Sequence, residues 1–380
     1  MIKGKLSNTG KDIFTMISDL TKGSDIINLA QGYPDFACRD ELKDLAIKYI
    51  RDDYNQYAHP DGVMELREAI VDQLVQRFGV NMDPVSEVTI TAGAGQSIYT
   101  VISSFISEGD EVVLFEPTYS SYISAIESNG GRPVFVQLQY PDYSIDWEAV
   151  QKIITSRTRL IIVNTPHNPT GAIFTANDLA QLQKITNGTK INILSDEAFE
   201  HIVYGPQKHV SVLSNPTLAE RSIVVSSFSK TFHVAGWKIG YCLAPEKLTS
   251  LIRRKQQFQI NSVNTPLQYA LAEYLRNGFD PGELLRDFEE NRQLMIRLFD
   301  PLPFEMTPTP STYFQLLSYK PLSDLKDSEF AHKVMEDVGV ALFPMSVFYH
   351  DAVDHKMVGL NFALDKELLI KAADRLKKLK

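Results

Sequence analysis

Hydrophobic residues follow two alternating patterns along the first two-thirds of the chain. In 62–78, Val63, Leu66, Ile70 and Leu74 fall on one face of a predicted helix. Further helical patterns alternate with short apolar, β-branched runs, which is typical of an α/β domain with a mainly parallel sheet between helices. We predict strands at 87–91, 111–116, 133–138, 158–164, 191–196, 222–227 and 239–244.

The pattern changes after about residue 245. A long helical region covers 246–276 and another covers 281–299. The strand-like segments STYFQLL, VALF and MVGLNFA then alternate with helices near 327–338 and 365–379, which indicates a second, smaller α+β domain. The predicted division is an N-terminal segment, 1–35, packing with the small domain, a large α/β domain, 36–270, and the small domain, 271–380.

Composition narrows the class of protein. A formal net charge of −9 argues against a nucleic-acid partner, because phosphate backbones call for a basic surface. Cys38 and Cys242 form no closely spaced pair, so we expect a cytoplasmic protein. The first ten residues lack the apolar core of a signal peptide, and no apolar run reaches the ~18 residues of a membrane span. The histidines show no metal-binding spacing, so we expect no metal.

Polar segments follow five of the predicted strands. These segments are AGAGQS, EPTYSSY, NTPHNPTG, DEAFEH and SFSK. In a parallel sheet the carboxyl ends of the strands meet at one edge, where ligands bind. We therefore expect the five segments to form a single site.

The first of these segments is rich in glycine. Gly93 and Gly95 open a predicted helix, and Glu116 ends the next strand, which imitates a dinucleotide-binding fingerprint, but Ile98 replaces its third glycine. Bare N–H groups at a helix start attract any phosphate. A plain strand–helix turn is the alternative for this segment taken alone.

Lys230 stands among serines directly after a buried strand. It is either a solvated loop lysine or a nucleophilic amine, since a desolvated lysine near another cation can form an imine with an aldehyde. Ser227 and Lys238 suit a phosphate, and Asp196 either caps a helix or faces the site. An aldehyde, a phosphate and an acid together describe pyridoxal phosphate.

The segment SSFSKTFHVAGWKIGY resembles the cofactor-lysine motif of the class I aminotransferases, which have the fold-type I pyridoxal-phosphate architecture. NLAQGYPDF, NQYAHPDG, FEPTYSSY, NTPHNPTG and SDEAFEH match the same family in the same order. The resemblance extends from Asn28 to the C-terminus and is nearest to bacterial methionine and kynurenine/glutamine aminotransferases. It implies a homodimer with shared active sites that moves an amino group from a methionine-, glutamine- or aromatic-like amino acid to a 2-oxo acid.

The resemblance also implies roles for individual residues. Lys230 would hold the cofactor covalently and then carry the transferred proton. Asp196 would pair with the pyridine nitrogen, Asn168 with the phenolic oxygen, and Tyr119 would stack on the ring. The phosphate would be held by Gly95, Gln96, Ser227 and Lys238, with Tyr57 reaching the site of the neighbouring subunit. The substrate would approach Gly32 and Asn168.

Two positions depart from the family pattern. Phe199 stands where the family usually has a tyrosine that donates to the phenolic oxygen. Gly359 stands where the family has an arginine that grips the substrate carboxylate, and Lys356, His355 or Asn361 are the candidates to replace it. Because of these departures, three alternative functions remain open. They are a pyridoxal-phosphate lyase, an amine-specific transaminase, and a cofactor-binding homologue with weak or no activity. A dinucleotide dehydrogenase is disfavoured because it leaves Lys230 and NTPHNPTG without a role.

Overall fold

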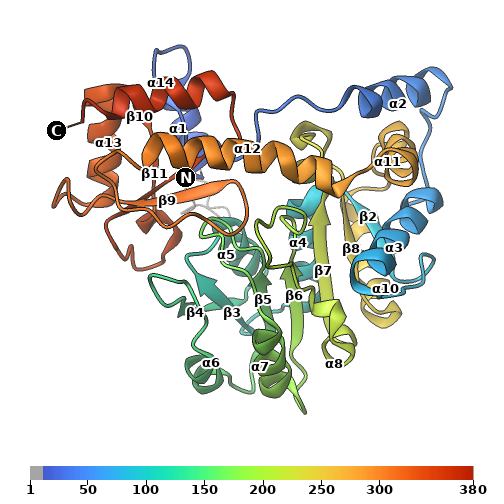
Figure 1. Cartoon of the computed structure of the whole chain (residues 1–380). Coiled ribbons are helices and arrows are strands. Elements are labelled where there is room, and N and C mark those ends of the chain that lie inside the picture. The colour runs from blue at the N-terminus through green and yellow to red at the C-terminus, as the bar shows by residue number, and fades with distance from the viewer. Residues whose placement is uncertain (1–11, 380) are drawn as a thin grey trace, which may run out of the picture.

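The computed structural model describes residues 12–379, and its large domain is built on a seven-stranded sheet between helices (Figure 1). The strand order is β2-β8-β7-β6-β5-β3-β4. β8 runs antiparallel to both of its neighbours, and the other pairs are parallel. The predicted fold class is therefore confirmed. The strands are β2 (Val88–Thr91), β3 (Glu111–Glu116), β4 (Arg132–Gln137), β5 (Thr158–Asn164), β6 (Asn192–Asp196), β7 (Ser222–Ser227) and β8 (Gly240–Leu243).

The two faces of this sheet belong to two separate cores. Along β3, Val112 and Leu114 join the core under helix α4, whereas Val113 and Phe115 join the larger core on the opposite face. This alternation follows from the two-residue period of a strand, and burial on both faces explains why the strands are continuous apolar runs. The helices of the large domain are α2 (Asp40–Arg51), α3 (Met64–Phe78), α4 (Gly93–Phe105), α5 (Ser120–Ser128), α6 (Trp147–Ile153), α7 (Ala176–Thr186), α8 (Pro216–Ala219), α9 (Phe228–Thr231), α10 (Glu246–Gln259) and α11 (Thr265–Asn277).

The helical region predicted over 246–276 is two helices. α10 ends at Gln259 and α11 begins at Thr265. Asn264 caps α11 through a hydrogen bond from the Leu267 N–H, and Pro266 occupies its first turn, where proline costs no hydrogen bond. Asn264 and Pro266 are therefore sequence signals that a second helix begins within 246–276.

The small domain contains a three-stranded antiparallel sheet in the order β11-β12-β9. In this sheet Gly359 pairs with Phe343 on one side and with Leu316 on the other. The elements are α12 (Pro281–Phe299), β9 (Phe314–Ser318), α13 (Asp327–Val338), β11 (Phe343–Pro344), β12 (Met357–Asn361) and α14 (Lys366–Leu376). In Figure 1, α12 runs across the top of the molecule from the side of α11 to this domain.

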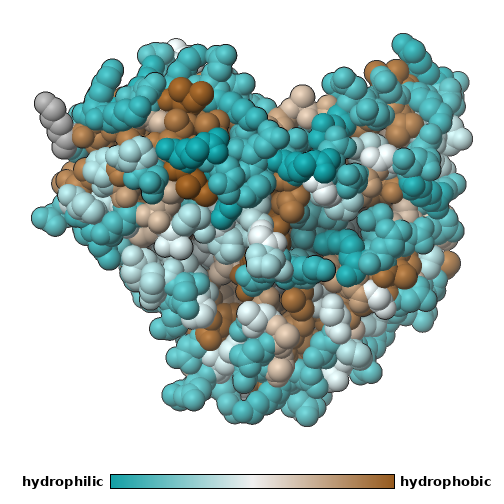
Figure 2. All heavy atoms as spheres, viewed as in Figure 1, coloured by the Kyte–Doolittle hydropathy of each residue, from teal (hydrophilic) through white to brown (hydrophobic). Residues whose placement is uncertain are grey.

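The N-terminal part of the described chain lies against the small domain. β1 (Ile27–Asn28) pairs in parallel with β10 (Val340–Ala341), and α1 (Ile13–Thr21) lies close to β11. Residues 1–11 of the predicted N-terminal segment lie outside the described part, and the domain limits remain a prediction. Between residues 12 and 379 no helix is both long enough and apolar enough to span a bilayer. The face seen in Figure 2 is mostly hydrophilic, with hydrophobic residues in separate patches.

Candidate active site

A cavity of about 350 Å³ lies at the carboxyl edge of the large sheet, and we call it the cofactor pocket. Segments far apart in sequence contribute to it, because the parallel register places the ends of β5, β6 and β7 side by side. Phe14, Tyr122 and Phe199 are among its walls. The predicted residues that line it are Gly32, Gly95, Gln96, Tyr119, Asn168, Asp196, Ser227, Lys230 and Lys238.

Lys230 lies in the short helix α9, which begins where β7 ends. The Ser227 hydroxyl accepts the Ser229 N–H at 3.2 Å, which turns the chain from strand to helix and directs Lys230 into the pocket. The Lys230 amine donates to the Gly32 carbonyl at 2.9 Å. Burial, helped by the charge of Lys238, lowers the pKa of Lys230 to about 8, although Asp196 opposes the shift. A neutral, nucleophilic amine is therefore accessible near physiological pH.

Asp196 ends β6 on the same side of the sheet. Its carboxylate accepts the Tyr122 hydroxyl at 2.6 Å and the Ala198 N–H at 3.2 Å. Burial raises the pKa of Asp196, while the hydrogen bond from Tyr122 opposes that effect. A buried carboxylate that faces a cavity suits a cationic partner, such as a protonated ring nitrogen.

The amino end of α4 forms an anion cradle. Gly93 has φ of +80°, and a side chain at Gly95 would meet nothing within 4 Å, so the backbone here is bare toward the cavity. The Gln96 side-chain oxygen accepts the Ala92 N–H at 3.0 Å. Lys238 reaches the same cavity from a left-handed backbone position, with φ of +54°. Bare helix N–H groups next to an ammonium form a phosphate site.

Asn168 supplies a polar atom that has no partner among residues 12–379. Its side-chain Oδ1 is buried and makes no hydrogen bond within this part of the chain, while its main-chain N–H donates to Asn164 Oδ1 at 2.8 Å. A buried amide left unpaired in this way is expected to bond a ligand. The pocket thus offers an amine, an acid, an anion cradle and an unpaired amide oxygen, and these groups fit pyridoxal phosphate.

The family model for class I and II aminotransferases matches residues 24–376. The chain belongs to this family. It is 40% identical over 378 residues to the methionine aminotransferase of Escherichia coli K12, covering 99% of this chain and 98% of that one.

Solved structures agree with this assignment. One from Escherichia coli, described as having a methionine aminotransferase function, matches with a TM-score of 0.97 and 39% identity over all of both chains. The N-succinyldiaminopimelate aminotransferase of Mycobacterium tuberculosis matches with a TM-score of 0.96 and 31% identity, again over all of both chains. The protein is a pyridoxal-phosphate-dependent aminotransferase that moves an amino group from an amino acid to a 2-oxo acid. These relatives do not favour the lyase, amine-specific or weakly active alternatives.

The structure also brings in residues that the sequence reasoning missed. The Tyr122 hydroxyl bonds Asp196, and the Tyr313 hydroxyl donates to the Gly32 carbonyl at 3.1 Å, next to the Lys230 amine. Tyr122 lies in the EPTYSSY segment three residues after Tyr119, a spacing that could have flagged it. No local signal marked Tyr313.

Phe199 forms part of the wall of the cofactor pocket, and its ring carries no hydroxyl group. It is 4% exposed and packs edge-on against Tyr313, with 5.2 Å between ring centroids. The Lys230 amine lies 6.0 Å from its centroid. This aminotransferase therefore offers an aromatic face where a tyrosine hydroxyl was expected from the family pattern.

None of the three candidates to replace the missing arginine lines the cofactor pocket. The Lys356 ammonium donates to two main-chain carbonyls in 324–325. His355 stacks on Tyr140 with 4.8 Å between centroids. The Asn361 side-chain amide donates to the carbonyls of Gln31 and Tyr33 at 2.8 and 2.9 Å. The structure therefore does not bring any of the three candidates to the cofactor pocket, and each makes contacts elsewhere.

Tyr57 lies outside the cofactor pocket of its own chain. Its side chain is 82% exposed. The predicted role of Tyr57 at the site of a neighbouring subunit stays a prediction.

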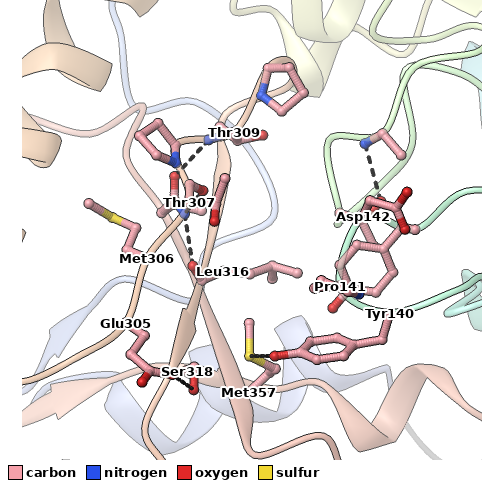
Figure 3. A pocket seen from close by; sticks show the side chains of 16 residues that line it. Tyr140, Pro141, Asp142, Glu305, Met306, Thr307, Thr309, Leu316, Ser318 and Met357 are labelled. Atoms are coloured by element: carbon pink, nitrogen blue, oxygen red, sulfur yellow. Dashed lines mark hydrogen bonds between the residues drawn. The ribbon is translucent and has the colours of Figure 1, made fainter.

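A larger cavity of about 440 Å³, which we call the outer pocket, lies between the small-domain sheet and the segment 140–143 (Figure 3). Leu316 of β9 and Met357 of β12 line it, and the Tyr140 hydroxyl lies 4.0 Å from the Met357 sulfur. Lys230 does not reach it. Size alone therefore does not locate the active site of this aminotransferase.

Proposed function

We propose that the cofactor pocket holds pyridoxal phosphate with Lys230 covalently linked to its aldehyde. When bound, the cofactor draws electrons away from the carbon that carries the transferred amino group. Asp196 keeps the ring nitrogen protonated, Asn168 bonds the ring oxygen, and Tyr119 packs on the ring face. Gly95, Gln96, Ser227 and Lys238 hold the phosphate. The observation that carries this proposal is a buried lysine of lowered pKa in the same cavity as a buried aspartate.

Lys230 is also the group that moves the proton during transfer. A general acid–base works best when its pKa lies near the working pH, and burial brings the pKa of Lys230 to about 8. The carbonyl of Gly32, at 2.9 Å, holds the amine at one side of the cavity. Lys230 is thus both tethered and able to take and return a proton.

The covalent link is tested by borohydride reduction of the holoenzyme, digestion and mass spectrometry. We expect the cofactor mass on the peptide that contains Lys230. Lys238→Met is the matched control, because it removes the other lysine of the pocket. With an excess of pyridoxal phosphate to offset the weaker phosphate site, the adduct should still form at Lys230. An adduct at another lysine, or none, would contradict the assignment.

We propose that the amino donor has a methionine-like, glutamine-like or aromatic side chain. The Escherichia coli relative is a methionine aminotransferase, and Phe14, Tyr119 and Phe199 give this pocket apolar walls. A screen of amino donors against the holoenzyme, read as the spectral change of the cofactor from aldehyde to amine form, tests the idea. Preference for aspartate or glutamate over methionine would exclude it.

We further propose a cytoplasmic homodimer with shared sites. Tyr57 and Phe258 are 82% and 84% exposed, and Gln259, next to Phe258, bonds the Gln96 side chain at 3.0 Å. Exposed aromatic residues close to a pocket are typical of an interface. Cys38 and Cys242 are free thiols, as in a reducing compartment.

Mixing inactive subunits tests the shared site. A heterodimer of Lys230→Ala and Tyr57→Ala subunits has one site with both changes and one with neither. We expect the mixture to recover activity above that of either parent, whereas sites built within one chain would give no recovery.

A further inference from the structure

Gly359 has no room for a side chain. A Cβ at this position would lie 2.1 Å from both Cε2 and Cζ of Phe343, its cross-strand partner. Residues paired across an antiparallel sheet share one face, so the Phe343 ring covers the Gly359 backbone. Both residues are buried. Phe343 therefore occupies the space into which a residue 359 side chain would point.

This ring belongs to an aromatic wall made of Phe14, Phe314, Phe343 and Phe348. The centroids of Phe314, Phe343 and Phe348 lie 6.1, 5.6 and 6.0 Å from that of Phe14. Phe14 is the member that faces the cofactor pocket. Aromatic rings in contact therefore lead from Gly359 through Phe343 and Phe14 to the cofactor pocket.

The neighbours of Gly359 on the same face of the sheet are apolar as well. Met357 precedes Gly359 by two residues and shares its face of β12, and both Met357 and Leu316 line the outer pocket (Figure 3). The small-domain sheet therefore directs no cationic side chain at the cofactor pocket through this face.

Two cationic side chains line the cofactor pocket within residues 12–379, namely Lys230 and Lys238. The proposed function uses both of them for the cofactor. A carboxylate in a pocket of low polarity is ordinarily held by an arginine fork or an ammonium. In the described chain a donor carboxylate finds only neutral partners, such as the amide of Asn168 and the backbone near Gly32.

We propose that Phe343 takes the place of a cationic carboxylate grip, so that this enzyme discriminates weakly between an amino-acid carboxylate and an uncharged carboxamide. This inference rests on the proposed function of the cofactor pocket. A neutral donor favours a carboxylate oxygen over a carboxamide oxygen only by the difference between a charge-assisted and a neutral hydrogen bond, about 1 kcal/mol, whereas a cation prefers the carboxylate much more strongly. Specificity then comes mainly from the donor side chain.

The experiment compares kcat/KM of the holoenzyme for methionine and methioninamide with the same 2-oxo acid, each corrected for the fraction of protonated amine. We expect the two values to lie within about tenfold, the scale of one neutral hydrogen bond. A preference for methionine of about 1000-fold or more would overturn the inference, because it requires a charge-specific grip. If neither donor reacts, the proposed function fails instead.

A variant can restore the grip. Phe343→Leu combined with Gly359→Arg opens the space and adds a guanidinium, and we expect it to raise the preference for methionine over methioninamide by about tenfold or more. Phe343→Leu alone is the control, with an expected ratio near that of the unmodified enzyme. An unchanged ratio in a folded double variant would overturn the inference. If near-ultraviolet circular dichroism shows that the double variant does not fold, the ratio of the unmodified enzyme decides.

Discussion

The two ends of the active site differ in the kind of side chain that they present. At the large-domain end, polar groups from β6, β7, α4 and α9 converge on one cavity, and each suits a part of pyridoxal phosphate. At the small-domain end, β12 presents a glycine under an aromatic ring. The two ends are built on separate sheets, so one can change its chemistry while the other keeps its own. The polar chemistry of this site is thus concentrated at the large-domain end, and the small-domain end is apolar.

Lys230→Ala should have the largest effect. Loss of the covalent link and of the proton carrier should lower kcat by about 10⁴-fold or more for every donor, carboxylate or carboxamide. Steady-state kinetics with both donors measures this. A loss confined to one donor would mean that Lys230 also serves the substrate end. The cofactor end and the substrate end would then not be chemically separate.

Asp196→Asn should lower kcat by about 10²- to 10³-fold, the usual cost of removing a group that stabilises developing charge. Tyr122→Phe removes one hydrogen bond to the carboxylate and should cost about tenfold to 100-fold. Both losses should be equal for methionine and methioninamide. If Tyr122→Phe leaves the rate unchanged, Tyr122 does not position Asp196.

The lowered pKa of Lys230 predicts a pH dependence for cofactor uptake. The neutral amine attacks the aldehyde, so below pH 8 the rate of reconstituting the apoenzyme should rise about tenfold per pH unit and level off above it. An amine at the ordinary pKa of 10.5 would keep rising instead. Lys238→Met removes a neighbouring positive charge, which should move the plateau to higher pH. Stopped-flow absorbance follows both, and a rise that continues past pH 10 would contradict the burial argument.

Phe199→Tyr should have the smallest effect. The added hydroxyl sits on a wall of the cofactor pocket and gives the ring oxygen a further donor, which should shift the visible titration of the bound cofactor and change kcat by about tenfold at most. Spectrophotometric titration of both forms checks this. An unchanged curve would show that another group, such as the Tyr313 hydroxyl, already serves that oxygen.

Sequence alone determined the elements of the large sheet, the order of the motifs and most polar residues of the cofactor end, with Tyr122 and Tyr313 as the exceptions. It could do so because hydrophobic period and strand-end chemistry are local, and because parallel strands bring their carboxyl ends to one edge. Lys230, Asp196 and Asn168 could therefore be assigned to one site before their distances were known.

Only the tertiary structure decided the substrate end. The bonds from Lys230 and Tyr313 to Gly32 join residues 198 and 281 positions apart, and no short segment encodes them. In the sequence, Gly359 indicates only that this position lacks the arginine side chain of the family pattern. Its pairing with Phe343 shows that the space is filled. The contacts of Lys356, His355 and Asn361 place those side chains elsewhere. Packing between distant segments sets what a pocket accepts, because close-packed interiors leave room for one ring or one side chain and not for both.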